Sequence, residues 1–198
     1  QVLSLHYDPL KTDLPGAIQS LCDTALSAVQ KGVCILILSD KNLTEDKHTV
    51  HALLATSAIH HVLVAKGLRT EANIIVQTAT VWDTHHIACL IGFGATAVCP
   101  YLAYEALQRL AAKDPAFVED MGYYGKNYRK GIIKGLYKIF SKMGISTVAS
   151  YRGAGLFEVL GLHQEVVDLC FPGMITRIGG ATFEDLHASD AHLHAKAF

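Results

Sequence analysis

Apolar residues change their spacing along this chain, so that short apolar runs alternate with longer segments of helical period. Val33 to Leu38 and Ala72 to Thr78 are runs of the length and composition of strands buried on both faces. Leu14 to Lys31 instead places apolar residues every three or four positions, as one buried helix face requires. This alternation predicts an α/β fold of repeated βα units, with a mostly parallel sheet covered by helices.

The same criteria predict elements along the whole chain. Strands are expected at Val2–Tyr7, Val33–Leu38, Ala72–Thr78, Ala95–Cys99 and Ile145–Ala149, and helices at Leu14–Lys31, Thr49–Lys66, Thr84–Phe93, Tyr101–Ala112, Tyr124–Lys142 and Ala154–Leu160. Lys113 to Gly122 is expected to be a polar connection containing Pro115. Glu165 to Phe171 fits either a strand or a short helix, and Thr182 to Asp185 carries a capping signal for a last helix. We expect residues 1–198 to form a single α/β domain.

The stretch from Asn127 to Leu162 holds the candidate residues of greatest interest. It predicts a helix with a buried stripe that includes Leu136 and Phe140, a strand at Ile145–Ala149, and a loop at 150–153. Sites in α/β proteins are usually built on loops that leave the carboxyl ends of parallel strands. The sequence therefore predicts candidate pocket residues in this loop: Tyr151, Arg152 and Gly153.

Composition limits the classes of function. The chain has 51% hydrophobic and 18% charged residues, enough for one sizeable core, and a formal net charge of -1. Near-neutral charge gives no overall attraction to nucleic acid or to an anionic membrane, and the apolar runs are far shorter than a membrane helix needs. We therefore expect neither nucleic acid nor a membrane as a partner, and no signal peptide is apparent.

The five cysteines are widely spaced and lie in apolar stretches. This usage is typical of reduced, buried thiols, so a cytoplasmic location is expected. No Cys-x-x-Cys pair is present, so we expect no metal, iron–sulfur cluster or other cofactor in this segment.

Two histidine pairs are candidates for a pocket. By helical phase, His61 should point inward and His60 should lie off that face, and a core histidine bonded to a carbonyl is the simplest interpretation. His85 and His86 begin a helix directly after a strand, where a neutral imidazole can line a pocket. A purely structural role for this pair stays open.

Two arginine–glycine runs could bind an anion. Arg152-Gly153-Ala154-Gly155 and Arg177-Ile178-Gly179-Gly180 each join an arginine to free backbone amides near an expected helix start. Both runs are also common as ordinary turns, and that alternative stays open. Arg177 is therefore added to the candidate loop residues.

The segments Ser141–Thr147 and Ser150–Ala154 resemble the central domain of the glutamate synthase large subunit. The similarity continues in the family's order through Leu36 with Ser39-Asp40, Ala52–Ala55, His60-His61, Gly67–Arg69, His85-His86, Leu90–Ala95, Pro100–Glu105 and Arg177–Gly180. Gly155 stands where this family commonly has glutamine, and Gln77 where it commonly has an acid, so neither side chain is assigned a role. The chain corresponds to the C-terminal part of that domain.

This resemblance implies a parent enzyme that makes L-glutamate from L-glutamine and 2-oxoglutarate. It implies FMN and an iron–sulfur cluster elsewhere in the parent, and a barrel-like or partly open barrel arrangement here in place of a flat sheet. It also implies partners: the amidotransferase and FMN domains of the same chain, and an electron-donor subunit or ferredoxin. The expected role of this segment is structural and channelling, without catalytic, cofactor-binding or metal-binding residues.

A second hypothesis from another class is an independent small α/β enzyme or anion-binding module. It would use the Arg152 loop together with His85 and His86. The two hypotheses differ in where these residues must lie, since only the second requires them to converge on one pocket.

Overall fold

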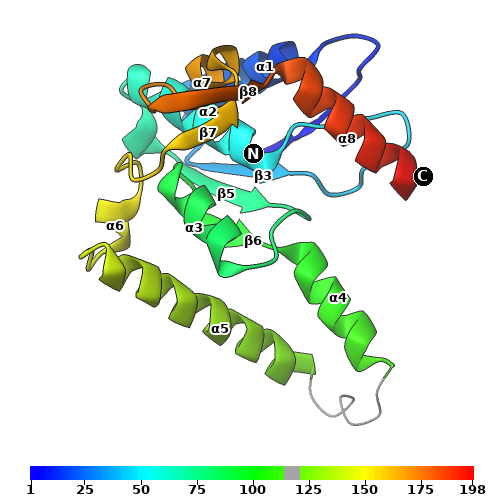
Figure 1. Cartoon of the computed structure of the whole chain (residues 1–198), viewed down its shortest axis with the longest axis vertical. Coiled ribbons are helices and arrows are strands. Elements are labelled where there is room, and N and C mark those ends of the chain that lie inside the picture. The colour runs from blue at the N-terminus through cyan, green and yellow to red at the C-terminus, as the bar shows by residue number, and fades with distance from the viewer. Residues whose placement is uncertain (114–120) are drawn as a thin grey trace.

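The computed structural model describes residues 1–113 and 121–198, and a parallel sheet of consecutive βα units forms its centre (Figure 1). Its four strands are β1 (Val2–Ser4), β3 (Ile35–Ser39), β5 (Asn73–Gln77) and β6 (Ala97–Cys99), in the order β1-β3-β5-β6. All three pairings are parallel. The predicted α/β class and mostly parallel sheet are confirmed.

Three helices follow the first three strands of this sheet. They are α1 (Leu14–Gln30), α2 (Ala52–Ala65) and α3 (Thr84–Gly92), and α2 contacts α1, α3, β3 and β5. Because the strand order follows the sequence and such crossovers are right-handed, these helices lie on the same face of the sheet. We call this the helix-covered face, and the opposite side the open face.

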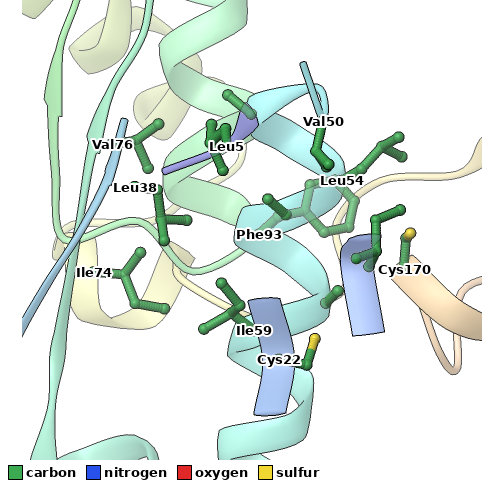
Figure 2. Packing of buried hydrophobic residues seen from close by; sticks show 14 of the residues in the cluster. Leu5, Cys22, Leu38, Val50, Leu54, Ile59, Ile74, Val76, Phe93 and Cys170 are labelled. Carbon is green, nitrogen blue, oxygen red and sulfur yellow. The ribbon is translucent and has the colours of Figure 1, made fainter. Parts of the chain in front are cut away.

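Side-chain alternation along the strands matches these two faces. Leu3, Leu38, Val76 and Val98 pair across the sheet on the helix-covered face, where the first three are at most 3% exposed. Figure 2 shows this packing from close by, with the following residues labelled: Leu5, Cys22, Leu38, Val50, Leu54, Ile59, Ile74, Val76, Phe93 and Cys170. The core therefore lies between the parallel sheet and the helices.

The predicted strand at Val2–Tyr7 is divided into two short strands, the second of which belongs to an antiparallel pair. Leu5 separates β1 from β2 (His6–Tyr7), which pairs with β4 (His48–Thr49). The Leu5 amide donates to the carbonyl of Ser39 at 2.9 Å, while the Leu5 carbonyl accepts from the amide of Val50 at 2.8 Å. Leu5 thus links two sheets, which sequence alternation alone does not reveal.

Capping residues fix where the first and last helices begin. Before α1, the Asp13 side chain accepts from the amide of Gly16, and Pro15 occupies the first turn. Before α8 (Phe183–Ala197), Thr182 and Asp185 form the predicted capping box. The α7 helix (Gln164–Cys170) resolves the choice between strand and helix in that region in favour of helix.

Two further helices extend from the end of the parallel sheet. α4 (Tyr101–Ala111) and α5 (Met121–Lys142) contact each other, and α5 also contacts α3. Pro115 and the greater part of the predicted polar connection lie outside the described residues. On α5, Phe140 is 8% exposed and Leu136 is partly buried, as the predicted stripe requires.

The predictions for 145–160 were wrong. No strand forms at Ile145–Ala149; instead Thr147 caps a short helix, α6 (Val148–Tyr151), with its hydroxyl 2.8 Å from that of Ser150. No helix forms at Ala154–Leu160, because Gly153 and Gly155 adopt positive φ, and the chain then enters β7 (Val159–Leu162). β7 pairs in parallel with β8 (Thr176–Ala181) in a separate two-stranded sheet.

The three sheets do not close into a barrel within the described ranges. The partly open form of the predicted arrangement is therefore the one that fits. None of the helices in residues 1–113 and 121–198 combines the length and the apolarity needed to cross a bilayer.

Candidate functional site

The six candidate residues lie in three separate places. His85 and His86 are in the first turn of α3, Tyr151, Arg152 and Gly153 lie beside the last turn of α3, and Arg177 is on β8. A helix of nine residues is about 13.5 Å long, so the first two groups are separated by most of that length. The structure does not gather the six into one pocket.

His85 and His86 are exposed and bonded locally. Asp83 caps α3 by accepting from the amide of His86 at 2.9 Å, and Nδ1 of His86 accepts from the amide of Trp82 at 3.2 Å. Nε2 of His85 lies 3.6 Å from Sγ of Cys89, one turn further along the helix. These contacts order the start of α3.

The Arg152 loop lies at the amino edge of the parallel sheet, contrary to the prediction. The amide of Gly153 donates to the carbonyl of Gly92 at 2.8 Å, and Gly92 ends the helix that leads into the start of β6. Tyr151 is 1% exposed, and the centroid of its ring lies 4.5 Å from that of Phe140 on α5. Because α6 replaces the predicted strand, the loop is placed by helix packing and does not continue from a strand.

His60 and Arg69 occupy the same amino edge, and sequence phase assigned the histidine pair the wrong way round. His60 is 8% exposed, while His61 is only half-buried and places Nδ1 2.8 Å from the carbonyl of Ser57. His60 points inward because it meets Gly94, Gly153 and Arg69, which come from other parts of the chain. We call His60, Arg69, Gly94, Arg152 and Gly153 the amino-edge cluster.

Arg69 is held by neutral acceptors. Its Nε donates to Nδ1 of His60 at 2.9 Å, and its terminal nitrogens donate to the carbonyls of Ala72 at 2.5 Å and Gly94 at 2.7 Å. Burial, followed by the charge of Arg69, lowers the pKa of His60 to about 4. The imidazole of His60 is therefore neutral and accepts from Arg69.

Glycines allow the close approach to His60. A Cβ on Gly153 would lie 3.2 Å from Nε2 of His60, and Gly153 has a φ of 68°. A Cβ on Gly94 would lie 2.5 Å from the ring, and its φ is 115°. Glycine is thus required at both positions by space and by backbone conformation.

Arg152 carries a buried donor without a partner in the described part of the chain. Its Nε is buried and has no hydrogen-bond partner among the described residues. A cavity of about 150 Å³ lies at the same edge of the sheet, lined by His60, Gly153 and Phe157, among others. A buried guanidinium nitrogen without an acceptor is costly, so this donor marks an unsatisfied point in the amino-edge cluster.

The carboxyl edge of the sheet holds a second polar group, centred on Asp40, which the candidate set did not include. Asp40 follows β3 directly and is 7% exposed. Its Oδ2 accepts from the hydroxyl of Thr78 at 2.5 Å, and both carboxylate oxygens lie 3.0 Å from the amide of Ala79. The available signal was a lone acid directly after an apolar strand.

A cavity of about 540 Å³ lies between this edge and α8. Asp40, Thr80 and Tyr101 line it on the sheet side, and Leu186, Asp190 and Leu193 line it on α8. Burial and the neighbouring Asp40 carboxylate raise the pKa of Tyr101. Arg177 lies apart from this cavity, exposed on β8.

The chemistry of the cysteines and histidines gives no metal-binding arrangement within the described ranges. No group of three or more His, Cys, Asp or Glu side chains there could hold a metal ion. Burial raises the pKa of the Cys22 thiol to about 11 and that of Cys170 to about 12, so both stay protonated. These residues do not fit an iron–sulfur cluster, which needs cysteine thiolates gathered together.

Comparison with known proteins identifies similar sequences. Residues 1–163 match the family described as glutamate synthase central domain. The ferredoxin-dependent glutamate synthase of Pyropia yezoensis is 46% identical over 192 residues, covering 91% of this chain and 12% of that protein. Ferredoxin-dependent glutamate synthase 1, chloroplastic/mitochondrial, of Arabidopsis thaliana is 41% identical and covers 100% of this chain and 13% of that protein.

A relative named for another electron donor, NADH, is also similar. Glutamate synthase [NADH] of Schizosaccharomyces pombe is 39% identical over 185 residues, covering 92% of this chain and 9% of that protein. The chain therefore spans between 9% and 13% of the length of these three relatives.

Proposed function

Because this chain belongs to the glutamate synthase central-domain family, we propose that it serves a glutamate synthase as a non-catalytic structural and channelling segment. The parent would make L-glutamate from L-glutamine and 2-oxoglutarate, with FMN and an iron–sulfur cluster held in its other parts. The partners of the segment would be the amidotransferase and FMN domains of the same chain, together with an electron-donor subunit or ferredoxin. Ferredoxin-dependent and NADH glutamate synthases are both similar to this chain, so the donor is not assigned.

The single observation that carries this proposal is the dispersal of the candidate residues. His85 and His86, the Arg152 loop and Arg177 contact different elements, and an enzyme or anion site built from them would need them together. The Arg152 loop holds α6 against the end of α3, His85 and His86 order the start of α3, and Arg177 is exposed on β8. That arrangement suits a segment that positions its neighbours, and we propose no catalytic residue in it.

We assign the contact with a neighbouring domain to the amino-edge cluster. Among the described residues, the Nε of Arg152 is buried without a partner next to Gly153, which lies against His60, while Arg152 as a whole is half-buried. A carbonyl or carboxylate of a neighbouring domain would accept from the part of the Arg152 side chain that stays accessible. This contact would align the wall of the ammonia path between the two active sites.

We also propose that residues 1–198 form one domain in a reducing, cytoplasmic setting. One cluster of buried residues extends from Leu3 through Ile59 to Val166 and Phe183, which supports a shared core. The five cysteines are free, which supports a reducing compartment.

The test uses the full-length enzyme carrying Arg152→Ala. If Arg152 aligns the path, glutamine-dependent glutamate synthesis should fall about tenfold, as expected for losing a charged hydrogen bond of roughly 1.5 kcal/mol. Synthesis supplied with free ammonia should fall much less, since that reaction does not need channelling. Ammonia released to the medium per glutamine hydrolysed should rise.

Arg129→Ala is the matched control, because Arg129 is exposed on α5. It should leave both rates and the ammonia release unchanged. An equal fall in the two rates for Arg152→Ala, or no fall, would remove the channelling role from Arg152.

A further inference from the structure

The open face of the parallel sheet has the composition of a buried surface. Its ten strand residues alternate with the buried ones and include Ile37, Ile75 and Ala97, which pair in one row, as well as Val2, Ser4, Ile35, Ser39, Asn73, Gln77 and Cys99. None of the ten is charged. A strand face that meets water normally carries polar and charged residues, so this face is not built for solvent.

Apolar side chains on this face are exposed at its ends and half-buried at Ile37 and Ile75. Val2 is 62% exposed and Ile35 is 45% exposed, while Leu36 and Leu38 on the other face are fully buried. Ala97 and Cys99 are exposed as well. Parallel sheets are found almost only with both faces covered, so the intact protein needs a layer here.

The edge of the sheet at β1 indicates where that layer comes from. Within the described residues, β1 pairs with β3 on one side alone, and the carbonyl of Gln1 accepts from Ile37 while the amide of Leu5 donates to Ser39. In a parallel ladder the intervening residues, Val2 and Ser4, then direct their backbone groups toward the free edge. A free edge of this kind is a template on which another strand can pair.

Chain order selects the occupant. Consecutive strands usually lie side by side, and β1 is the first of this sheet, so its free edge belongs to a strand that precedes it. After β6 the chain continues into α4 and α5, of which α5 contacts α3, and α8 contacts α1 and β4. These later elements therefore lie on the helix-covered side. The matching family is described as the glutamate synthase central domain, and this chain covers 12% of one relative and 13% of another.

We infer that the open face is an interdomain surface, covered by the part of the glutamate synthase chain that precedes this segment. That part adds a parallel strand along β1 and packs uncharged, apolar side chains against Val2, Ile37, Ile75 and Ala97. This inference rests on the proposed membership of a longer glutamate synthase, but not on the channelling role of Arg152.

The test places a photoreactive benzoylphenylalanine at position 2, in place of Val2, in the full-length enzyme. Irradiation should link it to a peptide that precedes this segment in the chain, as identified by mass spectrometry. The same amino acid in place of Tyr137, which is 68% exposed on α5, should give no link to that peptide. A link to a later peptide, a link to a second copy of the chain, or no link from position 2 would overturn the inference.

A second measurement avoids any substitution. In the native full-length enzyme, alkylation of Cys99 by iodoacetamide should be at least tenfold slower than in the urea-unfolded enzyme, because the preceding chain covers it. Comparable rates would overturn the inference. Glutamate synthesis by the same preparation reports separately on the proposed function, since an inactive enzyme with a protected Cys99 would contradict the function alone.

Discussion

The two edges of one parallel sheet stabilise opposite charges by the same means. At the amino edge, the Arg69 guanidinium donates to His60 and to two backbone carbonyls. At the carboxyl edge, the Asp40 carboxylate accepts from the Thr78 hydroxyl and the Ala79 amide. Neither charge has an ion-pair partner among the salt bridges of the described residues.

Backbone polarity explains why the amino edge holds a cation and the carboxyl edge an anion. Gly94 follows the last turn of α3, where carbonyls lack helical partners and a cation is favoured. Ala79 follows β5, where an amide is free to donate to an acid. The comparison teaches that a buried charge here depends on orphan backbone groups more than on an opposite charge.

The largest expected effect tests the amino edge. Arg69→Ala should lower the free energy of unfolding by about 5 kcal/mol, since three hydrogen bonds to a charged donor are each worth roughly 1.5 to 3 kcal/mol. Urea unfolding of the 198-residue chain measures it. Arg129→Ala, an exposed control, should change it by less than about 0.5 kcal/mol. A small effect of Arg69→Ala would mean that the amino-edge carbonyls find other donors.

The next effect tests the packing that brings the Arg152 loop to that edge. Phe140 lies against Tyr151, so Phe140→Ala should cost about 3 to 5 kcal/mol through lost burial and a cavity. Tyr137→Ala, at an exposed position of the same helix, is the matched control. An unchanged denaturation midpoint for Phe140→Ala would contradict the helix phase.

A pH dependence of the amino edge is expected from His60. Its pKa is lowered from 6.5 to about 4 in the folded state. Above pH 6.5 the imidazole is therefore neutral in both the folded and the unfolded state, and its titration does not change the free energy of unfolding. Below pH 6.5 the unfolded chain takes up the proton first, so stability falls between pH 6.5 and 4, by up to roughly 3 kcal/mol.

Urea unfolding at pH 7, 5.5 and 4 measures this loss. His60→Asn keeps an acceptor for Arg69 but does not titrate, so its unfolding free energy should fall less over this range. The same slope in both proteins would assign the loss to other groups.

The smallest effect tests the carboxyl edge. Asp40→Asn should cost about 2 kcal/mol, because a neutral amide accepts more weakly from the Ala79 amide and turns a donor toward its neighbours. Thr78→Val should cost a similar amount, and the double variant should cost less than the sum, since the two side chains share one hydrogen bond. Full additivity, measured by urea unfolding, would show that this bond contributes nothing.

Local patterns were sufficient for the first half of the fold. The runs Val33–Leu38 and Ala72–Thr78 predicted β3 and β5 because an apolar, β-branched run between two helices has few other ways to be buried. The capping box at Thr182 and Asp185 predicted the start of α8 because its hydrogen bonds are local. The resemblance to glutamate synthase central domains, carried by motifs such as Ser141–Thr147, is confirmed by the family match.

Contacts distant in sequence decided the rest. Ile145–Ala149 looked like a strand, but Thr147 and Ser150 started a helix there because Tyr151 packs against Phe140 on α5. His60 and His61 exchanged roles because Arg69, Gly94 and Gly153 converge on His60 from other segments. The sequence by itself determined the βα order, the helix caps and the family. Only tertiary structure decided which polar groups are buried together, because that depends on side chains far apart in the chain meeting at one edge of the sheet.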